Sequence, residues 1–174
     1  MKDIDIERER EVYLCVSLAI VVLINTIDEM KEQGLGELLN GLFGLKQAIQ
    51  DLVDTLIPKF VSRAISNSVW DGALKATTAI SILTANCKLI FKAVHNGEDV
   101  PLENCWNYFH KLIPSLKRLS NDMENSRTHL AALNIGEVAY CTGISWDNFT
   151  TTSEEVAKGL LLELKKFRVE HGMS

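Results

Sequence analysis

Apolar residues recur at alternating spacings of three and four along much of this chain, and that spacing constrains the fold more than any other feature. The longest such stripe lies between residues 101 and 134 and contains Leu102, Cys105, Phe109, Leu112, Leu116, Leu119, Met123, Ser126, Leu130 and Leu133. In an α-helix this heptad spacing brings every member onto one face, which must pack against a neighbouring helix. The stripe therefore predicts one long helix over 101–134, bent by Pro114 on its outer face.

Two earlier segments repeat the same spacing. The first consists of Leu35, Leu38, Leu42, Leu45, Ile49, Leu52 and Leu56, and the second of Ala73, Ala76, Ile80, Leu83, Cys87, Ile90 and Val94. Gly41 and Gly44 interrupt the first of these helices, and we expect them at a close helix–helix approach. A shorter amphipathic helix is expected from Ser153 to His171, with Thr152 as its N-cap because Glu155 follows three residues later.

No convincing period-two run is present, so the sequence gives no sign of a sheet. The connections between the predicted helices are short, which makes consecutive helices antiparallel neighbours. The sequence therefore predicts an all-α fold: an elongated antiparallel bundle of about five main helices in a single domain spanning 1–174.

The opening segment carries an uncharged run from Val12 to Ile27. A membrane-spanning helix needs roughly 20 apolar residues, and an export signal needs a positive leading region. Residues 1–11 instead hold five acidic and three basic residues. We therefore expect no membrane span here but the hydrophobic central helix of the bundle, with the other helices around it and Asn25 buried.

Charge and cysteine content narrow the function classes. The net charge is -5 and the basic residues are scattered, which argues against a nucleic-acid partner. The four cysteines lie far apart in apolar or helical contexts, so we expect reduced, structural thiols and a cytoplasmic protein.

The sequence offers no recognisable reaction chemistry. Its four histidines are far apart, and none has the Glu-x-x-His or His-x-x-x-His spacing of a metal site. No nucleophile motif or phosphate-binding loop occurs. We therefore predict no catalytic, cofactor-binding or metal-binding residues, and no cofactor.

Surface for a partner remains, and two features could supply it. One is the seam of the 101–134 helix at Leu116, Leu119, Met123 and Leu130, which a second copy could cover to make a homodimer; helices of the same chain could equally cover it. The other is the segment "GISWDNF", whose Trp146 and Phe149 are residue types common at interfaces. The alternative for these two aromatic residues is a lid on one end of the bundle.

The sequence therefore favours a non-enzymatic protein-interaction module, such as an inhibitor, adaptor or regulator, that binds another protein. One alternative is a helical bundle that docks on membranes or forms pores. A second alternative is an all-α enzyme of unrecognised type.

Overall fold

The computed structural model describes residues 2–29, 34–56, 63–132 and 144–172. These residues form α1 (Lys2–Glu29), α2 (Leu35–Leu56), α3 (Arg63–His95), α4 (Leu102–His110), α5 (Leu112–Ala132) and α6 (Trp146–Glu170), without a strand among them. Since α4 and α5 are the two halves of one bent helix, the fold is an all-α bundle of five helices packed antiparallel. The predicted fold class is confirmed.

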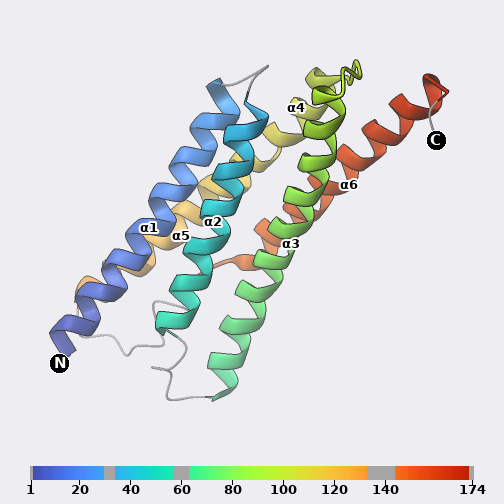
Figure 1. Cartoon of the computed structure of the whole chain (residues 1–174). Helices are drawn as coiled ribbons and strands as arrows, with labels where there is room; N and C mark the ends of the chain where they lie inside the picture. The colour runs from blue at the N-terminus through green and yellow to red at the C-terminus, as the bar shows by residue number, and fades with distance from the viewer. Residues whose placement is uncertain (1, 30–33, 57–62, 133–143, 173–174) are drawn as a thin grey trace.

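The helices form a ring around a shared core (Figure 1). α1 packs against α2 and α5, α2 packs against α3, and α6 closes the ring between α3 and α5. Consecutive helices alternate in direction, but an odd-numbered ring must contain one parallel pair. That pair is α3 and α6: Trp146 lies against Gly72, and farther along both helices Asn86 donates a 2.8 Å hydrogen bond to the carbonyl oxygen of Ala157.

The predicted central position of the first helix is wrong. One side of α1, including Ile20 and Leu23, is fully buried, but the opposite side is in water, and Leu18 is 55% exposed. Asn25, expected to be buried, is exposed as well. In a ring each helix packs against its two neighbours and the core, and nothing packs on its outer side. Even an uncharged helix in a ring therefore has one face in water. The mean hydropathy of a segment does not distinguish such a helix from a central helix that is buried all round.

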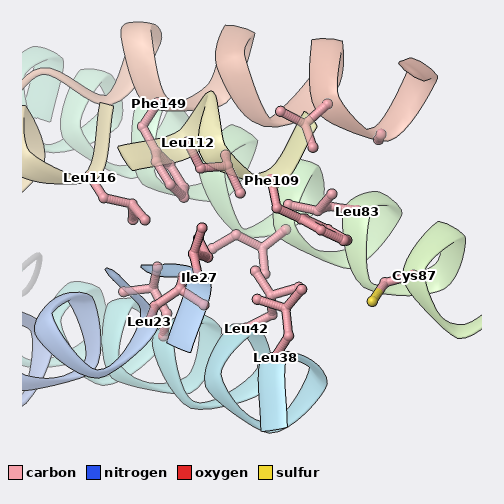
Figure 2. Close-up of a cluster of buried hydrophobic side chains, with 14 of the residues drawn as sticks. Leu23, Ile27, Leu38, Leu42, Leu83, Cys87, Phe109, Leu112, Leu116 and Phe149 are labelled. Atoms are coloured by element: carbon pink, nitrogen blue, oxygen red, sulfur yellow. The ribbon is translucent and has the colours of Figure 1, made fainter. Parts of the chain in front are cut away.

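The heptad stripes fill the core as predicted. The stripe of α2 is buried from Leu35 to Leu52, and that of α3 from Ala73 to Ile90. Figure 2 shows side chains of α1 and α2 facing those of α3, α5 and α6, among them Leu23, Ile27, Leu38, Leu42, Leu83, Leu112, Leu116 and Phe149. Burial of these apolar faces drives the packing of the helices.

The predicted helix over 101–134 breaks at Lys111. Pro114 has no N–H to donate to the carbonyl oxygen of His110, and its ring would clash with that oxygen in a continuous helix. The N–H of Lys111 instead donates to the carbonyl oxygen of Tyr108, three residues back, at 3.0 Å. Pro114 itself is exposed, so the bend lies on the outer face as expected and the buried stripe continues across it.

Two glycines permit close helix contacts. A Cβ added at Gly41 would lie 3.2 Å from Leu23 Cδ1 of α1, which confirms the expected close approach at this position. A Cβ at Gly44 would have no neighbour within 4 Å, so this second glycine has no such role. At Gly159 of α6 an added Cβ would overlap the ring of Tyr108, which crosses the helix at that point.

Candidate interaction surface

The seam predicted as a dimer surface is occupied by the chain itself. Leu116, Leu119 and Met123 are buried in α5, which packs against α1 on one side and α6 on the other. The side chain of Leu130 lies outside the described residues. Pairing of two copies through these leucines and Met123 would require the helices to separate, so they do not form an exposed surface.

Trp146 and Phe149 are also core residues. Within the segment "GISWDNF", α6 begins at Trp146, and the side chains of Trp146 and Phe149 are buried beneath its first turns. Asp122 of α5 accepts a 2.7 Å hydrogen bond from the backbone N–H of Ser145, and Ser115 donates a 3.0 Å hydrogen bond to Asn148. These bonds hold the start of α6 against α5.

The predicted N-cap of this helix is therefore wrong. Thr152 lies inside α6, where its Oγ1 donates a 2.9 Å hydrogen bond to the carbonyl oxygen of Asn148. The helix begins earlier because burial of Trp146 and Phe149 stabilises the additional turns. Tertiary packing has overridden the local capping signal.

The buried cysteines are not suited to nucleophilic chemistry. Burial raises the pKa of Cys87 to about 12, with nearby Cys105 adding to the effect. Burial and then the charge of Glu163 raise the pKa of Cys105 to about 11. Because the thiolate is the nucleophile, thiols with these pKa values are unreactive near neutral pH.

Within the described ranges no group of three His, Cys, Asp or Glu side chains is placed to hold a metal ion.

Two open hollows lie between helices in the described part of the chain. One lies between α4 and α6, where Asn104 is 3.4 Å from Glu163 and the ammonium of Lys111 lies 4.7 Å from the ring centre of Tyr108. These polar groups contact one another rather than converging on an empty centre. A second hollow between α2 and α3 is lined by Gln47, Gln50, Val53, Asp54, Ala73, Leu74 and Thr77. Neither resembles the enclosed pocket of a small-molecule enzyme.

The feature that requires explanation is the outer face of α1. Leu14, Leu18, Val21 and Val22 are each between 43% and 56% exposed. Helical periodicity places all four on one side of the helix. From Val12 to Ile27 no charge interrupts this α1 stripe. Contiguous exposed apolar side chains of this kind mark contact sites for proteins or membranes.

The sequence does contain a signal for the α1 stripe. Glu7, Glu11 and Glu29 are exposed and lie on the same side of the helix as Leu14 and Leu18. Acidic residues at both ends of a face indicate that the face is in water. The 16-residue run without charge draws attention to hydropathy instead, and the positions of these glutamates around the helix axis are then overlooked.

Among the described residues, two helices are long and apolar enough to cross a membrane, judged by length and composition. They are α1 over Glu7–Glu29 and α3 over Asp71–His95, and 39% of the apolar window in each is buried in the bundle. Core helices of soluble proteins pass the same criterion, so the expectation of no membrane span stays a prediction.

Fold and surface together define the class as an all-α antiparallel bundle with an apolar stripe on its outer side. Comparison of the chain with protein-family models, curated proteins and solved structures gives no match. Function must therefore be inferred from the surface chemistry of this chain.

Proposed function

We propose that this chain is a non-enzymatic protein-interaction module and that the α1 stripe is its docking surface. The exposure of Leu14, Leu18, Val21 and Val22 on one uncharged face carries this proposal. Covering apolar surface is favourable by roughly 25 cal/mol per Å². A partner that covers the stripe therefore gains binding free energy without any rearrangement of the bundle. An inhibitor, adaptor or regulator would work in this way, and we place it in the cytoplasm.

The charges around the stripe define the chemistry of the partner. Exposed Glu7 and Glu11 lie at one end, and exposed Asp28 and Glu29 at the other. Among the described basic residues of α1, Arg8 is exposed but lies off this face, and Arg10 is half-buried. Complementary charge favours and orients association. The fitting partner is an apolar protein surface with basic side chains at both ends; nucleic-acid phosphates would be repelled.

Site-specific photo-cross-linking tests this proposal. A photoreactive residue replaces Leu18 in the α1 stripe, and in a matched control it replaces Glu154, which is exposed on α6. In the cells that make the protein, we expect a protein adduct from position 18 and none from position 154. When the cross-linking is repeated in a lysate of these cells, adduct formation should decrease at high salt because the flanking charges are exposed. Equal adducts from both positions, or none from position 18, would refute the proposal.

Membrane docking is the second candidate function. It is favoured by the membrane-spanning length of α1 and α3 and by the apolar side chains that each exposes. The acidic ends of the α1 stripe oppose binding to anionic lipid through that face. Vesicle flotation and dye leakage, with neutral and with anionic phospholipid vesicles, separate this candidate from protein binding. Leakage from vesicles, with no protein adduct at position 18, would favour the membrane function.

A further inference from the structure

A second exposed apolar stripe lies along the outer face of α3. Leu74, Ile82 and Leu89 are between 39% and 48% exposed and lie on the same side of the helix. Thr78 and Ala85, also exposed, lie between them and add no charge. This α3 stripe is longer than the α1 stripe and lies on another part of the ring.

The net charge around the α3 stripe has the opposite sign to that around the α1 stripe. Lys88 and Lys92 are exposed at one end. The other end is mixed: Lys75 is exposed beside Leu74, and Asp71, the one acidic residue between 71 and 95, is exposed on the same face. The α3 stripe is therefore an apolar face with one basic and one mixed end, and its net positive charge complements the acidic α1 stripe.

The charge spacing of the two stripes also matches. Glu11 and Asp28 on α1 are seventeen residues apart, and so are Lys75 and Lys92 on α3. At 1.5 Å per residue, each pair spans about 25 Å. Because both ends of the α1 stripe are acidic, the basic end of the α3 stripe at Lys88 and Lys92 meets an acidic end whether the helices align parallel or antiparallel.

We infer that the α1 stripe of one molecule docks on the α3 stripe of a second copy of this chain. The inference rests on the proposed function, since it takes the α1 stripe as a docking surface, and it identifies one partner. A chain cannot make this contact with itself, because α2 lies between α1 and α3, which do not touch within the described residues (Figure 1).

Two-fold pairing of two α1 stripes is disfavoured by charge, because acidic ends meet acidic ends. Two α3 stripes carry three lysines against one aspartate each, so their pairing is also less favourable than pairing with an acidic α1 stripe. The α1–α3 contact joins different surfaces, so after a single contact the pair of molecules still has one free α1 stripe and one free α3 stripe. Such a contact extends into an open chain unless it closes into a ring. One helix pair is small beside the 1,200–2,000 Å² of a standard interface, so we expect association on the order of micromolar.

Sedimentation of two blocked variants tests the inference. Leu18→Asp places a charge in the α1 stripe, and Ile82→Asp places one in the α3 stripe. Both side chains are about half exposed, so the bundle tolerates the change. The mass of the unmodified chain should increase with concentration, whereas each variant alone should remain at 19.5 kDa. Leu162→Asp, at a similarly exposed apolar position on α6, should associate like the unmodified chain.

The mixture of the two variants gives the decisive result. Leu18→Asp retains an intact α3 stripe and Ile82→Asp retains an intact α1 stripe, so an equimolar mixture should form a dimer of twice 19.5 kDa and nothing larger. Two results would overturn the inference: an unmodified chain that stays monomeric at high micromolar concentration, or a mixture that shows no dimer.

The cross-linking experiment separates this failure from failure of the proposed function. A monomeric chain whose position 18 still cross-links to another protein overturns only the pairing of two copies. A monomeric chain with no protein adduct at position 18 overturns both.

Discussion

The indole Nε1 of Trp106 in α4 donates a 2.9 Å hydrogen bond to the backbone carbonyl oxygen of Ile27 in α1, and the bond is buried. Ile27 lies in the last described turn of α1. The bond therefore fixes this end of α1 to α4.

Trp106→Phe should lower the free energy of unfolding by roughly 0.5–1.5 kcal/mol, because it removes a buried hydrogen bond between α4 and α1. Trp146→Phe is the matched control. The Nε1 of Trp146 is buried but has no hydrogen-bond partner within the described part of the chain. Removing it should cost less, and urea denaturation measures both variants. Equal losses would show that the Trp106 bond adds nothing beyond packing.

Ile20 and Leu18 should respond oppositely to the same substitution. Ile20 is fully buried, so Ile20→Asp places an unpaired charge in the core and should unfold the protein. Leu18 is 55% exposed, so Leu18→Asp should change the stability by no more than about 0.5 kcal/mol. Thermal unfolding followed by circular dichroism checks both. Unfolding by Leu18→Asp would mean that the outer face of α1 is buried.

Gly159→Ala should destabilise the bundle. The new methyl would overlap the Tyr108 ring, and overpacking typically costs about 1–3 kcal/mol. Gly44→Ala is the control: its methyl enters open space, so it should stabilise α2 by roughly 0.5–1 kcal/mol. In a double-mutant cycle, Tyr108→Ala should remove most of the cost of Gly159→Ala. Additive losses in that cycle would contradict the close contact.

The cysteines should differ in their reactivity with an alkylating reagent. Cys15 is exposed, whereas Cys87 and Cys105 are buried. At pH 9, Cys15 should be modified in the folded protein, while Cys87, whose pKa is raised to about 12, remains protonated and protected. Peptide mapping by mass spectrometry follows each site. Modification of Cys87 as fast as Cys15 in the folded chain would contradict its burial.

The same pKa shift has a consequence for stability. The thiol of Cys87 ionises near 9 when unfolded and near 12 when folded, so the unfolded chain loses its proton first. Its contribution is complete below pH 9 and is lost as the pH increases through about 12. Cys87→Val should make the decline in unfolding free energy above pH 9 less steep. An unchanged decline would exclude this contribution.

Much of the fold could be predicted because the heptad spacing records which side of a helix is buried. Leu116, Leu119 and Met123 were placed on one packed face, and they are buried. Their covering by α1 and α6 could not be predicted, since a stripe does not identify its partner. Burial of these three residues leaves no exposed surface for a second copy here, and a dimer through Leu130 stays a prediction.

The candidate surface was missed for a related reason. Trp146 and Phe149 are residue types common at interfaces, but here their size fills the core. The leucines and valines of α1 were assigned to the core because hydropathy does not record direction. Which side of α1 is buried depends on the positions of α2 and α5, its neighbours in the ring. The sequence of α1 alone does not contain this information.

Charge reversal across the α1 and α3 stripes is the most direct test of their pairing. Glu11→Lys with Asp28→Lys, or Lys75→Glu with Lys92→Glu, should weaken self-association roughly tenfold or more. Each contact then changes from an attraction worth about 0.2–1 kcal/mol to a repulsion of similar size. All four residues are exposed, so the bundle should remain folded. Sedimentation equilibrium of the chain carrying all four substitutions should show the association of the unmodified protein restored, because opposite charges again face each other. A fourfold variant no better associated than its two parents would contradict the pairing.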